Sequence, residues 1–96
     1  MEPVVLINAF EVPEGEEDVF LARWREAADH MRRQDGYVST RLHQSLDPGA
    51  RFRFINVGVW RSAADFQRAV RTDEFAGIAT RMPFTSQPAL YRVVAE

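Results

Sequence analysis

Hydrophobic and polar residues alternate with two different periods along the chain, and each change of period predicts a new element. A β-branched and aromatic run over Val4–Val12 is typical of a strand. Apolar residues then recur at helical spacing, which predicts a helix over Glu16–Arg33. Two further strands are expected over Tyr37–Leu46 and Arg51–Trp60. The turn residues Asp47–Ala50 between them indicate an antiparallel hairpin.

The rest of the chain continues with helical and extended segments. Ser62 followed by Asp65 is similar to a capping box, so a helical region should begin at Ser62 and restart near Thr72. The two prolines of Met82–Pro88 favour an irregular loop, and Ala89–Val94 should form the last strand. The order βαββαβ predicts one α+β domain over residues 1–96. We expect a ferredoxin-like, four-stranded antiparallel sheet with both helical regions on one face.

The hairpin predicts which side chains share a face, because alternate residues of a strand point to opposite sides. With Leu46 opposite Arg51, the polar and aromatic residues form what we call the polar–aromatic face, with the pairs His43–Phe54, Arg41–Asn56, Ser39–Gly58 and Tyr37–Trp60. Asn8 of the first strand is expected to join this face. The aliphatic residues of the other parity should pack under the helices: Val38, Thr40, Leu42, Ile55, Val57 and Val59.

The polar–aromatic face should therefore lie on the side of the sheet that the helices leave open. Such a face is too polar for a core and too aromatic for plain exposure to water. We expect a second copy of the chain to cover it, which makes the protein a homodimer. A space between the sheet and its cover, lined by aromatic rings and a few polar groups, is the expected form of a small-molecule site.

Composition excludes several classes of function. Twelve basic and fourteen acidic residues give a net charge of −2, which argues against nucleic-acid binding. There is no cysteine, and the two histidines lack the spacing of a metal ligand set, so no metal site is expected. No apolar run has the length of a membrane span and the N-terminus does not resemble a signal peptide. We therefore expect a cytoplasmic protein that does not bind membranes.

Several segments resemble the antibiotic biosynthesis monooxygenase family: NVGVW at Asn56–Trp60, RSAADF at Arg61–Phe66, TDEF at Thr72–Phe75, the opening strand and helix, and GYVSTRLHQSL in the hairpin. The resemblance covers nearly the whole chain. It implies a dimeric α+β barrel, in which two ferredoxin-like protomers meet sheet to sheet. It also implies oxygenation of an anthrone- or quinol-like polyketide with O2 as co-substrate and no metal, flavin or haem.

The resemblance also assigns roles to residues. Asn56 and Trp60 match the pattern of the anthrone-oxidising members, which implies that Asn56 bonds a substrate or peroxide oxygen and that Trp60 stacks on the substrate or donates its indole N–H. The chain departs from those members at Phe66, where they have a tyrosine. It departs from the haem-degrading members at Ala69 and Ala79, where a tryptophan and a haem-ligating histidine are missing. Haem degradation is therefore not expected.

The predicted polar–aromatic face supplies the remaining candidates. His43 is a candidate general base, and Arg41 a candidate partner for a phenolate or carboxylate. Asn8, Tyr37 and Phe54 are candidate substrate contacts.

Each candidate also has a structural alternative. Asn56 and Asn8 could be amides that tie strands together, and Trp60 could fill the core or an interface. His43 could be a surface residue, and Arg41 could pair with an acid across the dimer. The second histidine, His30, lies at the edge of the first helix's apolar stripe and is expected to be exposed.

The leading hypothesis is a cofactor-free monooxygenase that oxidises a small aromatic or polyketide substrate with O2. Two alternatives stay open. One is a non-oxidative polyketide cyclase or isomerase that uses the same pocket, with Arg41 and His43 as polar guides. The other is a non-catalytic protein that binds a small molecule.

Overall fold

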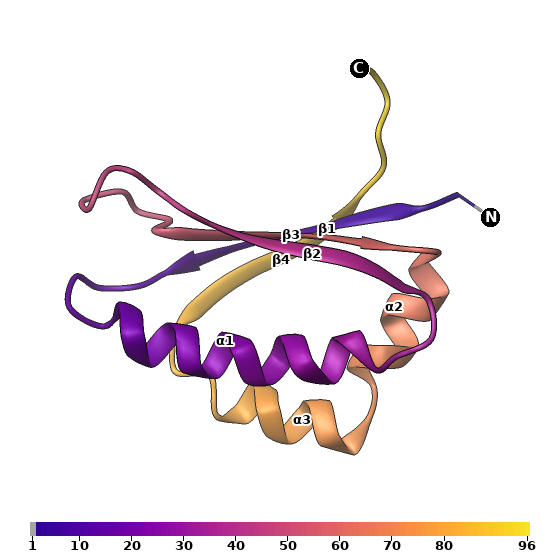
Figure 1. The fold of residues 1–96 in the computed structure, drawn as a ribbon, viewed down its shortest axis with the longest axis horizontal. Helices are drawn as coiled ribbons and strands as arrows, with labels where there is room; N and C mark the ends of the chain where they lie inside the picture. The colour runs from indigo at the N-terminus through magenta and orange to yellow at the C-terminus, as the bar shows by residue number, and fades with distance from the viewer. Residues whose placement is uncertain (1) are drawn as a thin grey trace.

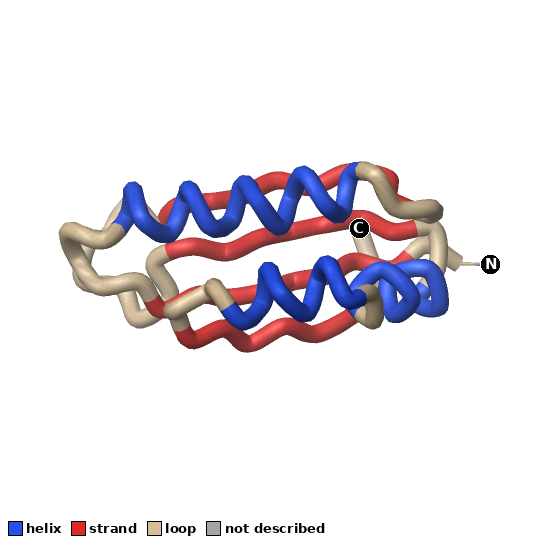
Figure 2. Tube along the Cα trace, turned by 90° about the horizontal axis from the view of Figure 1, so that it is seen from below, coloured by secondary structure: helices blue, strands red, loops and turns tan. Residues whose placement is uncertain are grey.

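The computed structural model describes residues 2–96 and has a four-stranded antiparallel sheet with three helices on one face (Figures 1 and 2). The elements are β1 (Val4–Glu11), α1 (Glu17–Arg32), β2 (Tyr37–Gln44), β3 (Phe54–Trp60), α2 (Ala63–Val70), α3 (Asp73–Thr80) and β4 (Thr85–Tyr91). The strand order is β2-β3-β1-β4. This order and the single helical layer are those of the ferredoxin-like α+β fold, so the predicted fold class is confirmed.

The two short helices begin where the capping residues predict. The Ser62 hydroxyl accepts a hydrogen bond from the backbone N–H of Asp65 (3.2 Å) at the start of α2. The Thr72 hydroxyl accepts one from the backbone N–H of Phe75 (3.0 Å) at the start of α3. Each cap satisfies a backbone donor that has no partner within its helix. The second helical region is therefore two helices joined by a corner.

Gly36 ends the connection between α1 and β2 in a left-handed conformation, with φ +88°. A Cβ at this position would lie 2.4 Å from both Cβ and Oδ2 of Asp65, so only glycine fits. Asp65 is buried and accepts hydrogen bonds from Arg61 and Arg68, both at 2.8 Å. These two guanidinium groups, with Ser62, lower the pKa of Asp65 from 3.8 to about 2. The network fixes α2 against the end of the hairpin.

Aromatic residues form the core at one end of the sheet. Phe10, Phe20 and Phe54 are buried, and the rings of Phe20 and Phe54 stack with centroids 4.6 Å apart. A second cluster at the other end contains Leu6, Trp60 and Ala69. The two clusters hold α1 and α2 on the same face of the sheet.

The pairing of β2 with β3 differs from the predicted register by one residue. His43 lies opposite Ile55, and Arg41 lies opposite Val57. The turn predicted at 47–50 does form, since the Ala50 N–H donates to the Asp47 carbonyl oxygen (3.1 Å), but it lies within a longer connection over residues 45–53 and does not fix the register. A bulge between Tyr37 and Ser39 then restores the predicted pairing of Tyr37 with Trp60. The prediction was right at this one pair and wrong along the rest of the hairpin.

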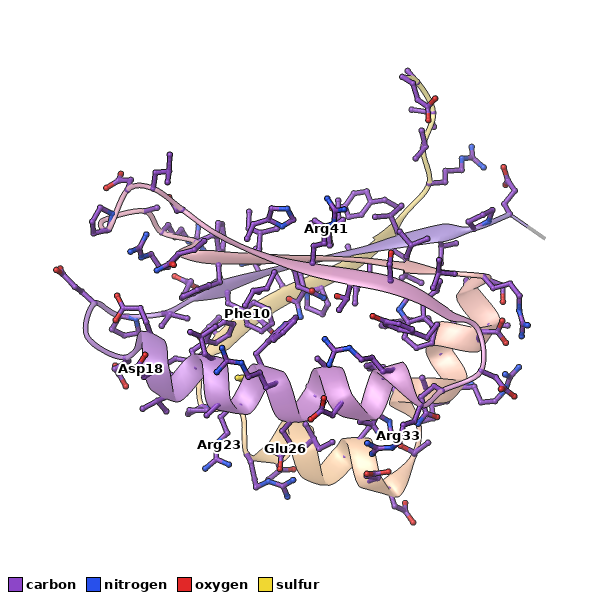
Figure 3. The ribbon with its side chains drawn as sticks, viewed as in Figure 1. Phe10, Asp18, Arg23, Glu26, Arg33 and Arg41 are labelled. Atoms are coloured by element: carbon purple, nitrogen blue, oxygen red, sulfur yellow. The ribbon has the colours of Figure 1, made fainter. Side chains whose placement is uncertain are left out.

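This shift exchanges the faces of β2 relative to β3, because the side-chain period of a strand is two. Thr40 and Leu42 face the helices, whereas Arg41 points away from them (Figure 3). Relative to the prediction, strands β1 and β3 are turned over, whereas residues 40–43 of β2 point to the sides predicted for them. The amide- and aromatic-bearing parity of β1 and β3 faces the helices, and Ile55, Val57 and Val59 face the open side. The prediction that the polar–aromatic residues line the open side was right for Arg41 and His43 and wrong for the others, namely Asn8, Tyr37, Phe54, Asn56 and Trp60.

Two further predictions were wrong. The segment Met82–Pro88 is not all loop, because β4 begins at Thr85 and places Pro88 opposite Asn8. A proline is tolerated there since β4 is an edge strand, with one side free of partners. Residues 92–96 lie beyond the strand and extend away from the sheet (Figure 1).

His30, expected to be exposed, is 1% exposed, because α2 and α3 cover that side of α1.

Candidate functional site

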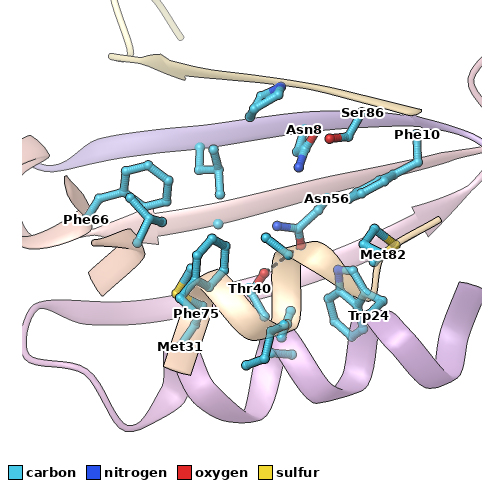
Figure 4. Close-up of a pocket in the computed structure, with 18 of the residues that line it drawn as sticks. Asn8, Phe10, Trp24, Met31, Thr40, Asn56, Phe66, Phe75, Met82 and Ser86 are labelled. Carbon is cyan, nitrogen blue, oxygen red and sulfur yellow. Dashed lines mark hydrogen bonds between the residues drawn. The ribbon is translucent and has the colours of Figure 1, made fainter. Parts of the chain in front are cut away.

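A cavity of about 570 Å³ lies between the sheet and the helical layer of the chain (Figure 4). Strands β1–β4 form its floor, and side chains of α1, α2 and α3 form its walls. Its aromatic lining comes from Phe10, Trp24, Tyr37, Trp60, Phe66, Phe75 and Phe84. This volume and this lining are typical of sites for small organic ligands.

Two amides lie at the middle of the cavity floor. Asn8 and Asn56 are opposite each other on the neighbouring strands β1 and β3, and both project toward the helices (Figure 4). The Thr40 hydroxyl donates a 2.6 Å hydrogen bond to Oδ1 of Asn56. Because its oxygen is engaged in this way, Asn56 presents its two N–H donors to the cavity.

Asn8, the second amide, is hydrogen-bonded differently from Asn56. Its Oδ1 is buried and has no hydrogen-bond partner within residues 2–96. A buried acceptor left unpaired costs about 1–3 kcal/mol. The nitrogen end of Asn8 is directed into the cavity, so both amides present N–H donors at its floor (Figure 4).

Trp60 lies further along β3, on the same cavity floor as the two amides. A Cβ added to Gly58 would lie 3.8 Å from Nε1 of Trp60 and 3.5 Å from the Thr40 hydroxyl, so the glycine separates these two groups. The Trp60 ring is held edge-on by Tyr37 and Phe66, with centroids 5.7 and 5.5 Å away. Its indole edge therefore has a fixed position at the cavity floor.

None of the residues that line the cavity is a carboxylate, lysine, arginine or histidine, and Tyr37 is the one titratable side chain among them. In the described part of the chain, no three His, Asp or Glu side chains gather as metal ligands would. No helix of residues 2–96 is both long enough and apolar enough to cross a membrane. The cavity is suited to neutral, mainly apolar molecules with a few oxygen atoms.

The structure brings together four of the predicted site residues and separates three. Asn56, Trp60, Asn8 and Tyr37 line the cavity. Phe54 is instead a core residue, 2% exposed and stacked on Phe20.

His43 and Arg41 are exposed on the open face of the sheet, with Nδ1 of His43 3.3 Å from the Ile55 carbonyl oxygen. They share no site with Asn56, because the one-residue shift in register turns them to the other side.

Sequence reasoning missed the contribution of the helices. Trp24 and Met31 on α1, Phe75 on α3, and Met82 beyond it line the cavity opposite the amides (Figure 4). The residues of α1 belong to a regular apolar stripe, which predicts burial but does not distinguish a core from a cavity wall. Thr40 was also missed, since its parity placed it among aliphatic residues.

The chain belongs to the antibiotic biosynthesis monooxygenase family, because the family model matches residues 3–81. A proposed monooxygenase from Shewanella loihica PV-4 is 41% identical, with a TM-score of 0.87 over 99% of this chain and 97% of that one. SnoaB, a cofactor-independent oxygenase from Streptomyces nogalater, is 26% identical, with a TM-score of 0.88 over 100% of this chain and 97% of that one. No curated protein sequence matches the chain significantly.

Proposed function

We propose that the protein is a cofactor-independent monooxygenase that oxidises a small, neutral, anthrone- or quinol-like aromatic with O2 in this cavity. The observation that carries the proposal is the uncharged aromatic cavity whose floor holds Asn8, Asn56 and the Trp60 indole. Family membership and the likeness to the cofactor-independent oxygenase SnoaB support the same reaction.

The proposed reaction needs no electron source beyond the substrate. An anthrone loses a proton from its CH2 group, and the resulting anion gives one electron to O2. The substrate radical and superoxide then combine to form a C–O bond, and protonation gives a hydroperoxide. Loss of water from the hydroperoxide breaks the O–O bond and leaves the ring carbonyl of a quinone. One oxygen atom of O2 enters the product and the other leaves as water.

The floor residues have distinct roles in this proposal. The N–H groups of Asn56 stabilise the oxygen that becomes negative when the substrate loses its proton, and the Thr40 hydrogen bond keeps them aimed at the cavity. The side-chain N–H of Asn8, beside Asn56 on the floor, donates to a second substrate oxygen and so fixes the ring's orientation. Trp60 packs against the aromatic substrate.

The proton that leaves the substrate goes to water in this proposal. No carboxylate or imidazole lines the cavity, and Phe66 occupies the place where the sequence resemblance expects a tyrosine. The substrate must therefore be acidic enough to ionise without a strong protein base.

We also propose a homodimer that meets through the open face of the sheet. Aliphatic side chains of β3 occupy this face, and Ile55 is 36% exposed. Burying such a surface against a second copy removes it from water. The predicted cytoplasmic location stays a prediction.

The test is turnover of 1,8-dihydroxyanthrone under 18O2 by protein treated with a chelator. The proposal predicts one labelled oxygen in the quinone, formed faster than in buffer alone, and a lower rate for Trp60→Phe. A product with no label and no O2 uptake would contradict the proposal. With a polyketide substrate, ring closure without O2 uptake would indicate a cyclase, and binding without turnover would indicate a binding protein.

A further inference from the structure

Four polar side chains form a line across the cavity floor, one from each strand of the sheet. In the strand order β2-β3-β1-β4 they are Thr40, Asn56, Asn8 and Ser86, and all four line the cavity (Figure 4). The order of chemical groups is hydroxyl, amide, amide, hydroxyl. The two central amides therefore each have a hydroxyl-bearing residue on the strand next to them.

The two hydroxyl–amide pairs have the same register. Thr40 lies two residues before the residue of β2 that is opposite Asn56, and Ser86 lies two residues before the residue of β4 that is opposite Asn8. Both strand pairs are antiparallel, so each hydroxyl is a diagonal neighbour of its amide. The Thr40 hydroxyl spans this diagonal to reach Oδ1 of Asn56 at 2.6 Å. Ser86 is in the equivalent place to reach Oδ1 of Asn8.

The two pairs differ in hydrogen bonding and in exposure. The Thr40 bond is formed in the structure, whereas Oδ1 of Asn8 is buried and has no partner within residues 2–96. Ser86 is opposite the core residue Phe10, so it is on the side of the sheet that faces the helices, and yet it is exposed. The helical layer therefore leaves this part of β4 uncovered, and Ser86 lies at a mouth of the cavity.

A ligand in the cavity changes what the Ser86 hydroxyl can bond. The ligand excludes water from the mouth, and a hydroxyl that loses contact with water needs a protein partner. The unpaired acceptor on the neighbouring strand is Oδ1 of Asn8, which is directed away from the cavity interior (Figure 4). Rotation about χ1 of Ser86 alone changes the direction of its hydroxyl, with no movement of the backbone.

We propose that Ser86 is a positioning residue for Asn8. In the ligand-bound protein its hydroxyl donates to Oδ1 of Asn8 and holds the Asn8 N–H groups toward the ligand, as Thr40 does for Asn56. The cavity floor then presents two preorganised donors instead of one. This inference rests on the proposed use of the cavity as the substrate site.

The first test measures the Kd of 1-hydroxyanthraquinone, a neutral aromatic with two neighbouring oxygens, by quenching of tryptophan fluorescence. Both tryptophans of the chain, Trp24 and Trp60, line the cavity. Ser86→Ala should weaken binding by about five-fold, as expected for one hydrogen bond. Ser86→Thr keeps the hydroxyl and should bind as wild type does. Gln87→Ala, at the next residue of β4 and opposite Ala9 on the other face, is the control and should also bind normally.

A double-mutant cycle separates positioning from direct contact with the ligand. In an Asn8→Ala background there is no amide to hold, so Ser86→Ala should change the Kd by less than about two-fold. An equal loss of affinity in both backgrounds would mean that Ser86 acts without Asn8, and would overturn the proposal. Wild-type affinity in Ser86→Ala, or the same loss in Ser86→Thr as in Ser86→Ala, would overturn it too.

The second test observes the amides directly and needs no Asn8 variant. Asn8 and Asn56 are the two asparagines of the chain, so 15N-asparagine labelling gives two pairs of side-chain N–H signals. A hydrogen bond to the amide oxygen strengthens the double-bond character of the C–N bond and slows the exchange of its two protons by rotation. With 1-hydroxyanthraquinone bound, Ser86→Ala should speed this exchange at Asn8 and not at Asn56. Thr40→Val should do the reverse.

Equal exchange rates at Asn8 in wild type and Ser86→Ala would contradict the role of Ser86. Neither test requires O2 or turnover. Failure of the Ser86 proposal therefore leaves the oxygenation to be decided by isotope incorporation, and failure of the oxygenation leaves the binding result unchanged.

Discussion

Thr40 on β2 donates a 2.6 Å hydrogen bond to the side-chain oxygen of Asn56 on β3. The bond crosses from one strand to the next along the cavity floor and is possible because Thr40 faces the helices. The bond determines that the nitrogen of the Asn56 amide, and not its oxygen, faces a ligand in the cavity. A preorganised donor of this kind costs no reorganisation when negative charge develops on the substrate.

Replacing Asn56 should slow the proposed reaction strongly, and replacing Thr40 should slow it less. Asn56→Ala removes the donors and should lower kcat by about a hundred-fold. Thr40→Val keeps the shape but frees the amide to rotate, and should lower kcat by about five-fold, as expected for one hydrogen bond. Steady-state O2 uptake measures both values. Ser39→Ala removes the neighbouring hydroxyl on the opposite face and serves as control. Equal effects in the Thr40 and Ser39 variants would contradict this role.

Gly58 is the position where the cavity floor has room that a side chain can fill. A Cβ there would be in ordinary contact with the Thr40 hydroxyl at 3.5 Å, so Gly58→Ala should fold. The added methyl group narrows the space between Thr40 and the Trp60 indole, and should weaken binding of an aromatic ligand by about ten-fold. Fluorescence titration measures the Kd. Gly49→Ala, in the distant hairpin loop, should bind normally, and equal affinities in both variants would argue against this floor as the binding surface.

The order of elements could be predicted from the sequence because its signals are local. The capping residues Ser62 and Thr72 and the helical spacing of the α1 stripe act within a few residues, so they give the helices and their starts. The faces of the hairpin could not be predicted in this way. They depend on the length of the loop over 45–53 and on the bulge after Tyr37, and neither has a local signature.

The same limit applies to the candidate site. Asn8, Asn56 and Trp60 could be selected because polar or large residues interrupt aliphatic strands. The side of the sheet toward which these three side chains point could not be predicted, since the open and covered sides of this sheet both carry apolar residues. His30 illustrates the point: its position on α1 is at the edge of the apolar stripe, and only the placement of α2 and α3 buries it.

Gly36 should be among the least replaceable residues of the fold. In Gly36→Ala, a left-handed backbone and a Cβ 2.4 Å from Asp65 combine, and we expect a loss of about 3 kcal/mol in the free energy of unfolding. Gly15 has a similar φ of +93° with open space around it, so Gly15→Ala isolates the backbone part and should lose about 1 kcal/mol. Urea denaturation measures both losses. Equal losses would mean that the contact with Asp65 is unimportant.

Asp65 should make part of the free energy of unfolding depend on pH in the acidic range. Its pKa in the folded protein is about 2, below the ordinary value of 3.8, chiefly because of its hydrogen bonds with Arg61 and Arg68. A lowered pKa stabilises the folded state above pH 4, and this contribution is lost as the pH falls from about 4 to about 2. The difference in unfolding free energy between wild type and Asp65→Asn should therefore shrink over that range.

Chemical denaturation at a series of pH values measures this difference. Asp29→Asn, at an exposed carboxylate that pairs with Arg32, is the control and should change stability little at any pH. A difference between wild type and Asp65→Asn that stays constant down to pH 2 would contradict the assignment.

The most direct test of the cavity as the reaction site is a crystal structure of the protein with a bound hydroxylated anthraquinone, the product class of the proposed reaction. We predict that its rings lie between the sheet and the helices, with one oxygen within about 3 Å of the Asn56 side-chain nitrogen, an ordinary hydrogen-bond distance. A quinone bound instead on the open face of the sheet, beside Arg41 and His43, would contradict the account.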